Sequence, residues 1–272
     1  MRGFNLIIKP DNEDADATEV LVDGTIGDKP YRFLLDTGAA RTCIQFDEYT
    51  STLFAYTEPS NSSGVFAKRN STEELITVPS IELGPITQRN FPVVRVAEER
   101  PDVKNLIGMD LLKNHRCHFF FDEHHVTIDA NDEFSVGSSL HDLFLDTTFH
   151  PYIDVHFGTL TAHAVWDTGA GITIADMQFI RTYPALFEEV GRSRGTDATG
   201  TTMDTSMFIM AAPIIGTRTF PPHKVAGVDL SFVNATIEVP MDLILGYSTL
   251  SKANWLFDFP RKKWGILNLL KT

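Results

Sequence analysis

Short runs of alternating hydrophobic and polar residues, bounded by glycine, proline and polar residues, recur along the whole chain. Runs of this length that are rich in Val, Ile, Phe and Thr are typical of β-strands. The pattern predicts strands at 19–26, 31–35, 118–122, 126–128, 151–157, 161–166, 255–258 and 264–266. Helical patterning covers only a few turns, which we expect at 46–53, 109–113, 177–189 and 247–252. The fold class predicted from these patterns is all-β with few short helices.

The tetrapeptide Asp-Thr-Gly-Ala occurs twice, at 36–39 and at 167–170, an offset of 167 − 36 = 131 residues. A given tripeptide of this kind is expected about 0.05 times by chance in a chain of this length. Each copy follows two strand-like runs that are joined by a glycine-containing turn, at Gly27 and at Gly158. Each copy is therefore expected to follow a β-hairpin, and the chain to contain an internal duplication.

The duplication continues after the tetrapeptides. An element of two apolar residues and a glycine ends at Gly108 in the first half and at Gly246 in the second. A short helical stretch follows each, and then an aromatic strand that closes on Asp122 or on Asp258. We therefore predict two similar halves, residues 1–130 and 149–272, joined by a connection at 131–148.

Asp36 and Asp167 are the candidate catalytic residues. Two carboxyl groups that face each other across a pseudo-twofold axis do not both ionise easily, because like charges raise one pKa and leave one shared proton. The ionised aspartate takes a proton from water, and the protonated aspartate polarises a carbonyl group. This chemistry requires neither a metal nor a cofactor, and we expect none.

Thr37, Gly38, Thr168 and Gly169 are expected to support the two catalytic loops. A threonine hydroxyl both donates and accepts hydrogen bonds, so the threonines are expected to brace the loops against each other. The glycines are expected where the backbone makes an unusual turn and where substrate must approach a carboxylate.

Taken together, the duplicated Asp-Thr-Gly-Ala and the later glycine elements resemble the aspartic protease clan over about residues 19–266. The resemblance implies two β-barrel-like lobes related by a pseudo-twofold axis, with one catalytic aspartate from each lobe. It also implies that Gly108 and Gly246 close a structural motif beneath each catalytic loop. Having both lobes in one chain is similar to the pepsins, whereas Ala39 and Ala170 resemble the retropepsins.

Pepsin-like enzymes carry Ser or Thr at the positions of Ala39 and Ala170, and that hydroxyl hydrogen-bonds the neighbouring carboxylate. Alanine removes this bond, so we expect the activity optimum to be less acidic than that of a stomach enzyme.

The family covers its cleft with a β-hairpin flap. In the first half the candidate is 61–66, with Gly64, Val65 and Phe66 as the expected substrate contacts; in the second half it is 194–200. Mobile glycine-rich hairpins suit a lid. Ordinary surface hairpins are the alternative interpretation of both segments.

Composition and charge exclude several partners. Lys and Arg total 23 against 36 Asp and Glu, a net charge of −13, which disfavours nucleic acid. No apolar run approaches the ~20 residues needed to span a bilayer, and the first ten residues lack the apolar region of a signal peptide. We therefore expect a soluble cytoplasmic protein that is a monomer, because both lobes lie in one chain.

Two further local features, the segment from His115 to His118 and Trp166, are expected to be structural rather than a metal site or a substrate contact. His115, Cys117 and His118 lie close together, but strand alternation places His118 on the opposite face from the other two. Trp166 directly precedes Asp167 and is expected to pack in the core rather than contact substrate.

The leading hypothesis is an aspartic endopeptidase, a hydrolase that cleaves peptide or protein substrates with a water activated between Asp36 and Asp167. The alternative is a catalytically silent peptide-binding or inhibitor module of the same fold, because a fold does not determine function. Both aspartates lie in complete motifs, which favours activity.

Overall fold

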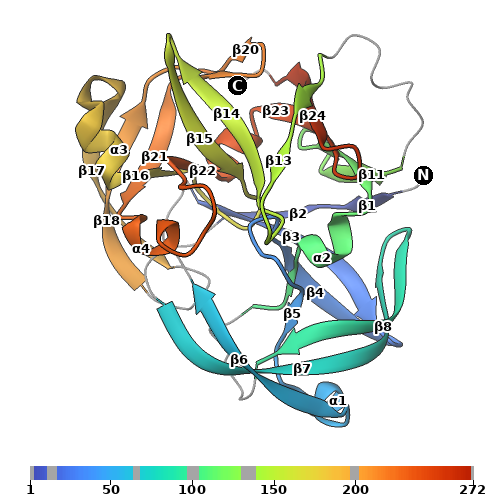
Figure 1. Cartoon of the computed structure of the whole chain (residues 1–272). Coiled ribbons are helices and arrows are strands. Elements are labelled where there is room, and N and C mark those ends of the chain that lie inside the picture. The colour runs from blue at the N-terminus through green and yellow to red at the C-terminus, as the bar shows by residue number, and fades with distance from the viewer. Residues whose placement is uncertain are drawn as a thin grey trace.

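Three β-sheets make up most of the protein, and its helices are all short (Figure 1). The computed structural model describes residues 3–10, 17–63, 68–96, 104–129, 139–196 and 202–270. The prediction of an all-β protein is confirmed. Among the described residues, no helix is long and apolar enough to cross a membrane.

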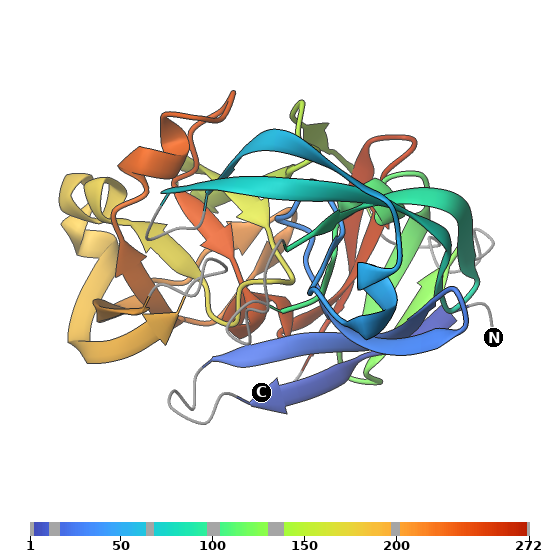
Figure 2. The same ribbon diagram turned by 90° about the horizontal axis from the view of Figure 1, so that it is seen from below.

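The first sheet is built from the N-terminal half of the chain. Its eight strands lie in the order β2-β3-β4-β9-β5-β8-β7-β6. They are β2 (Ile7–Pro10), β3 (Thr18–Ile26), β4 (Lys29–Leu35), β5 (Cys43–Ile44), β6 (Ala55–Ser63), β7 (Lys68–Leu83), β8 (Ile86–Arg95) and β9 (Leu106–Ile107). In Figure 2, β6 and β7 form a long pair of ribbons that runs along one side of the molecule.

The second sheet is built from the C-terminal half and has ten strands. Their order is β17-β18-β21-β16-β22-β15-β14-β19-β20, with β13 paired to β14. They are β13 (Phe144–Leu145), β14 (Pro151–Phe157), β15 (Leu160–Trp166), β16 (Ile174–Asp176), β17 (Phe187–Thr196), β18 (Thr202–Met210), β19 (Ile214–Ile215), β20 (Arg218–Thr219), β21 (His223–Val228) and β22 (Leu243–Leu245).

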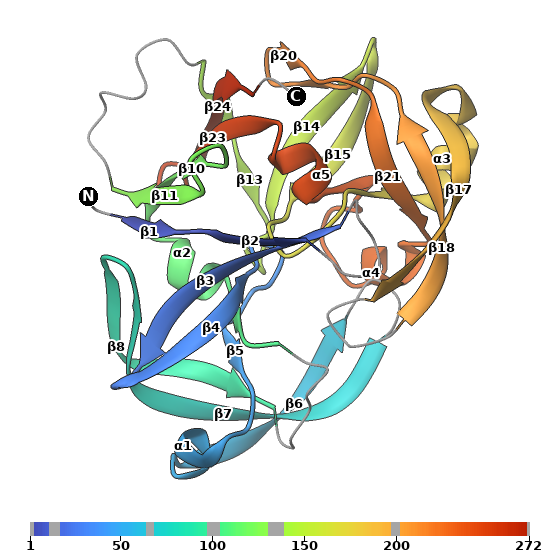
Figure 3. The same cartoon turned by 180° about the vertical axis from the view of Figure 1, so that it is seen from behind.

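The third sheet joins strands from both halves. Its order is β1-β11-β10-β23-β24-β12, where β10 pairs with β23 in antiparallel register. The six strands are β1 (Gly3–Asn5), β10 (Arg116–Phe120), β11 (His125–Ile128), β12 (His141–Asp142), β23 (Ala253–Asp258) and β24 (Lys263–Leu269). Figure 3 shows β1 and β2 running in line along the boundary between the two halves.

The connection predicted at 131–148 includes 131–138, which lie outside the described residues. Its described part contains the short strands β12 and β13, which join the third and second sheets. The connection is thus partly built into the sheets rather than a loop throughout.

Within the described residues, five short α-helices accompany the sheets: α1 (Glu48–Ser51), α2 (Met109–Leu112), α3 (Met177–Thr182), α4 (Ser231–Asn234) and α5 (Tyr247–Leu250). The helix predicted at 177–189 is wrong in its second half. It ends at Thr182, a 3-10 turn follows at Pro184–Leu186, and β17 begins at Phe187. Proline disfavours helical backbone in the residue before it, here Tyr183, whose φ and ψ are −126° and 58°.

One large hydrophobic core spans both halves of the chain. At its centre the ring of Trp166 lies 4.7 Å from that of Phe119 and 4.4 Å from that of Phe257. Trp166 is fully buried, so it packs in the core as expected. Because Asp167 follows it directly, this packing fixes the start of the second Asp-Thr-Gly loop.

Candidate active site

The two Asp-Thr-Gly loops begin in the same way. In the first half, β4 pairs in parallel with β9, and the Asp36 N–H donates to the Ile107 carbonyl at 3.0 Å. In the second half, β15 pairs in parallel with β22, and the Asp167 N–H donates to the Leu245 carbonyl at 3.0 Å. Each aspartate therefore leaves its strand from an equivalent position, and the two loops meet.

Reciprocal hydrogen bonds between Thr37 and Thr168 hold the loops together. The Thr37 N–H donates to Thr168 Oγ1 at 3.2 Å, and the Thr168 N–H donates to Thr37 Oγ1 at 3.1 Å. Each hydroxyl also donates to a carbonyl of the opposite half, Thr37 to Trp166 at 2.8 Å and Thr168 to Leu35 at 2.6 Å. All four groups of the brace are thus paired in the buried centre.

Gly38 and Gly169 make room for the opposite aspartate. A Cβ atom on Gly38 would lie 2.6 Å from Asp167 Oδ2, and one on Gly169 would lie 2.5 Å from Asp36 Cγ. Both glycines lie in the turns where they were expected, but neither has a positive φ angle. The requirement for glycine comes from close approach between the loops.

The carboxyl groups of Asp36 and Asp167 are hydrogen-bonded to each other. Burial and the adjacent charge of Asp167 raise the pKa of Asp36 well above the ordinary carboxyl value. Burial also raises the pKa of Asp167, but the N–H groups of Gly169 and Gly38 oppose this shift; they donate to its Oδ1 at 2.8 and 3.1 Å. The pair therefore shares a proton and titrates as a unit, and Asp36 is the member whose pKa is raised further.

Gly108 and Gly246 lie directly beneath the loops. The Gly108 N–H donates to Thr42 Oγ1 at 3.2 Å, and the Gly246 N–H donates to Thr173 Oγ1 at 3.1 Å. A Cβ on Gly108 would lie 2.5 Å from the Arg41 carbonyl carbon, so this position too is filled by backbone. These contacts fix the base of each loop.

The two halves differ in the group that completes this base. In the first half, Asp110 accepts from the Thr42 N–H at 2.8 Å and from its hydroxyl at 2.7 Å. In the second half, Thr173 Oγ1 lies 2.6 Å from Thr249 Oγ1, which lies 2.6 Å from His223 Nε2. The sequence patterns did not predict this role of His223. Its partner Thr249 lies 26 residues further along the chain, and only the fold brings the two side chains together.

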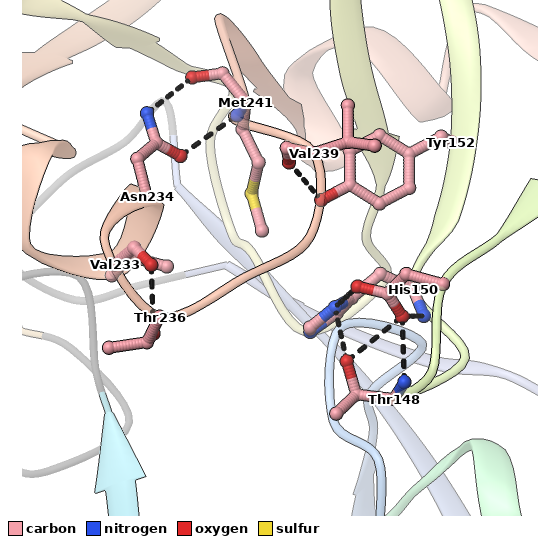
Figure 4. A network of polar contacts seen from close by, with 9 residues as sticks. Thr148, His150, Tyr152, Val233, Asn234, Thr236, Val239 and Met241 are labelled. Atoms are coloured by element: carbon pink, nitrogen blue, oxygen red, sulfur yellow. Dashed lines mark hydrogen bonds and ion pairs between the residues drawn. The ribbon is translucent and has the colours of Figure 1, made fainter.

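A second group that was missed lies before β14. Asp146, Thr148 and His150 form a compact hydrogen-bonded network, part of which is drawn in Figure 4. The sequence carried one signal for it: His150 lies 150 − 19 = 131 residues after Glu19, the same offset that relates the two aspartates.

Residues 22–114 match the family model described as gag-polyprotein putative aspartyl protease. The match covers about a third of the chain and supports its membership of the aspartic protease clan. The matched range contains Asp36 and Gly108 but not Asp167, whose loop has the equivalent hydrogen bonds described above. No curated protein matches the sequence significantly.

The residues predicted to form the flap contacts lie outside the described part of the chain. Gly64, Val65 and Phe66 lie outside the described residues, in the sequence between β6 and β7, and 197–200 of the second flap candidate also lie outside them. Their role stays a prediction.

The described part of the chain holds no group of three or more His, Cys, Asp or Glu side chains arranged to bind a metal ion. His115 and Cys117 have different neighbours. His115 Nδ1 lies 2.9 Å from Asp129 Oδ2, whereas Cys117 is buried in the core.

Proposed function

We propose that the protein is an aspartic endopeptidase, with Asp36 and Asp167 as its catalytic residues. The observation that carries the proposal is the hydrogen-bonded carboxyl pair formed by two mirrored loops, with raised pKa values on both sides. A protonated and an ionised carboxyl group side by side provide a general acid and a general base.

The proposed reaction assigns the shared proton to Asp36, the member whose pKa is raised further. Asp167, as the ionised member, takes a proton from a water molecule whose oxygen attacks the peptide carbonyl carbon. Asp36, as the protonated member, donates to the carbonyl oxygen, so that a tetrahedral diol forms. Return of a proton to the amide nitrogen then allows the C–N bond to break and releases a carboxylic acid and an amine.

The environment of the pair supports an optimum less acidic than that of a stomach enzyme. Burial raises both pKa values, and the Ala39 and Ala170 side chains carry no hydroxyl that would stabilise the ionised carboxylates. The ascending acid limb of the rate profile is expected to reflect the ionisation of the pair as a unit.

The test is cleavage of a diverse peptide library from pH 3 to 8 by the wild-type protein and by Asp36→Asn. We expect cleavage by the wild type that is lost in Asp36→Asn and blocked by a statine or hydroxyethylene inhibitor. Asp154→Asn is the matched control, because Asp154 is an exposed aspartate of β14. Cleavage that persists in Asp36→Asn contradicts the proposal, and inhibitor binding without any cleavage would favour a silent peptide-binding module.

A further inference from the structure

A chain of hydrogen bonds runs from the base of the second catalytic loop to His223 on β21. The Gly246 N–H donates to Thr173 Oγ1 at 3.1 Å, and Thr173 Oγ1 lies 2.6 Å from Thr249 Oγ1. Thr249 Oγ1 in turn lies 2.6 Å from His223 Nε2, and His223 Nδ1 lies 2.8 Å from the Pro221 carbonyl. Both threonines are fully buried and His223 is 7% exposed, so these groups must satisfy one another.

The partners of His223 fix the direction of this hydrogen-bond chain. A carbonyl oxygen only accepts, so Nδ1 carries a hydrogen and donates it to the Pro221 carbonyl. In a neutral imidazole Nε2 is then an acceptor, and the Thr249 hydroxyl donates to it. Thr249 has one hydroxyl hydrogen, so the bond between the two threonines must be donated by Thr173. Both hydroxyl groups therefore donate toward His223, and Thr173 Oγ1 stays an acceptor for the Gly246 N–H.

The surroundings of His223 favour its neutral form. Burial outweighs the bond to the backbone carbonyl and lowers the pKa of His223 to about 4, and the positive charge of Lys252 lowers it further. On the neighbouring strand β18, the residue opposite His223 is Met210, and β16 pairs with the far end of β21. The helix α5 packs against β21 (Figure 3) and contributes Thr249, which carries no charge. The ring nitrogens are thus bonded to a carbonyl and a hydroxyl group rather than to a carboxylate.

The first half of the molecule completes the same base with a single side chain. Asp110 and Ser248 occupy equivalent positions, two residues after the glycine beneath each loop. Asp110 accepts the N–H of Thr42 at one oxygen and its hydroxyl at the other. Ser248 has one oxygen, which accepts the Thr173 N–H at 3.0 Å, and the Thr173 hydroxyl turns to Thr249 instead. The second half therefore needs a further acceptor, and β21 supplies it.

The backbone at Gly246 holds the second catalytic loop from behind. The carbonyl of Leu245, directly before this glycine, accepts the Asp167 N–H at 3.0 Å. The N–H of Tyr247, directly after it, donates to the Ala170 carbonyl at 2.9 Å. The segment 245–247 thus binds the loop at both ends of its Asp-Thr-Gly-Ala sequence, and the hydrogen-bond chain holds the N–H in the middle of this segment. A shift in the chain is therefore passed to the backbone of Asp167.

We propose that neutral His223 is a positioning residue of the active site, which fixes the base of the Asp167 loop through the two buried threonines. Protonation would place a hydrogen on Nε2, so that the ring donates to Thr249 and the direction of the chain reverses. The acceptor left for the Thr173 hydroxyl is then the Gly246 carbonyl at 3.4 Å, which is a long contact. The catalytic part of this inference rests on the proposed function, because it requires Asp167 to act on substrate.

The kinetic test compares the wild type with Thr249→Val and Thr249→Ser on a peptide that the wild type cleaves. Valine keeps the shape of threonine but interrupts the hydrogen-bond chain, whereas serine keeps the hydroxyl. We expect kcat and kcat/KM of Thr249→Val to fall together by about 10-fold or more, because a displaced Asp167 affects the transition state rather than substrate binding. Thr249→Ser is expected to stay near the wild type. Wild-type kcat in Thr249→Val, or a serine variant as slow as the valine variant, overturns the inference.

Thr161→Val is the matched control. Thr161 Oγ1 lies 3.0 Å from His156 Nδ1 at the surface of the β14–β15 hairpin, near its turn. The variant therefore loses a threonine–histidine contact that is not linked to the base of a catalytic loop. Its kcat is expected to equal that of the wild type. A fall as large as that in Thr249→Val would also overturn the inference, because the loss would then not depend on the buried chain.

The protonation of His223 is measured without any cleavage. The imidazole 15N resonances of the wild-type protein at pH 7, assigned by their loss in His223→Gln, report which nitrogen carries the hydrogen. We expect a protonated Nδ1 and an unprotonated Nε2. A hydrogen on Nε2 at pH 7 overturns the inference, and this measurement decides even if Thr249→Val does not fold.

Amide hydrogen exchange separates the inference from the proposed function. The Asp167 N–H donates to Leu245, and the equivalent Asp36 N–H, which donates to Ile107, is the internal reference. We expect Thr249→Val to speed exchange at Asp167 by about 10-fold or more relative to Asp36, because only the second loop loses its support. Equal rates of change at both amides, or none at Asp167, overturn the inference. If the wild type cleaves nothing, the proposed function fails, and the 15N spectrum and the exchange rates still decide whether His223 supports the loop.

Discussion

Gly38 lies so close to the carboxyl group of Asp167 that a single methyl group on its Cα would lie 2.6 Å from Oδ2, 2.7 Å from Cγ and 2.9 Å from Oδ1. The same relationship holds between Gly169 and Asp36, at 2.5–2.8 Å. Each half of the chain therefore supplies one carboxyl group and the space for the other. This exchange explains why both copies of the motif carry glycine although neither position has a positive φ.

Gly38→Ala is expected to lower kcat/KM by about 100-fold or more, because the new methyl group must displace the Asp167 carboxyl group by a large fraction of an ångström. Gly169→Ala is expected to act equally, through Asp36. Gly158→Asn is the control, since its Cβ would meet nothing within 4 Å and its φ of 61° suits asparagine. Wild-type activity in Gly38→Ala would show that the loops can move to accommodate the methyl group without disturbing the Asp167 carboxyl group.

Thr37→Val is expected to destabilise the protein by about 2–4 kcal/mol, measured by urea unfolding. The change leaves the Thr168 N–H and the Trp166 carbonyl buried without their partner, and an unsatisfied buried group costs about 1–3 kcal/mol. Thr168→Val is expected to cost a similar amount, because it strands the Thr37 N–H and the Leu35 carbonyl.

Thr37→Ser keeps the hydroxyl and is the control for the brace. We expect it to lower the free energy of unfolding by less than about 1.5 kcal/mol, the effect of removing one buried methyl group. If the valine and serine variants are equally stable, the reciprocal hydrogen bonds do not hold the loops together.

Asp36→Asn is expected to unfold at a higher urea concentration than the wild type at pH 7. Burial and the neighbouring Asp167 raise the pKa of Asp36 in the folded state above its unfolded value of about 3.8. The folded state therefore binds more protons in the window between these values, and stability falls as pH rises through it. Asparagine does not titrate, so Asp36→Asn avoids this loss. Its gain in the free energy of unfolding over the wild type should be present at pH 7 and absent near pH 3. A variant less stable than the wild type at pH 7 would contradict the raised pKa.

Local patterns were sufficient to predict the elements that carry the catalytic loops. The strand predicted at 151–157 coincides with β14, and that at 161–166 lies within β15. Alternation and a glycine turn define such a hairpin within one stretch of sequence. The duplicated motif then predicted two loops related by symmetry, and the hydrogen bonds of Thr37 and Thr168 have the mirrored pattern that this symmetry requires.

The parts that sequence reasoning missed depend on contacts between distant segments. The close approach at Gly38 was missed, because the Asp167 carboxyl group that occupies its Cβ position lies 129 residues away. The helix predicted at 177–189 ends at Thr182, and the last residues of the predicted range pair with β18 instead. Pro184 is a local signal for this end, but the pairing with β18 joins segments that no short window contains.

His223 is expected to make the protein lose stability in mild acid. Burial, which outweighs the hydrogen bond with the Pro221 carbonyl, lowers the pKa of His223 to about 4, from an ordinary value of 6.5. Between these two values the unfolded chain binds a proton that the folded protein does not, so stability falls as pH drops from about 6.5 to about 4 and is level below that. The full effect amounts to about 3 kcal/mol.

The measurement is urea unfolding from pH 3.5 to 7.5 for the wild type and His223→Gln. Glutamine cannot take up this proton, so the part of the slope between pH 6.5 and 4 that arises from His223 should disappear. Because Thr249 links His223 to Thr173 beneath the second catalytic loop, acid loss of activity is expected to follow the same window. His156→Gln is the control, since His156 lies on β14 and contacts Thr161 at the surface. An unchanged slope in His223→Gln would show that the pKa of His223 is not lowered in the folded protein.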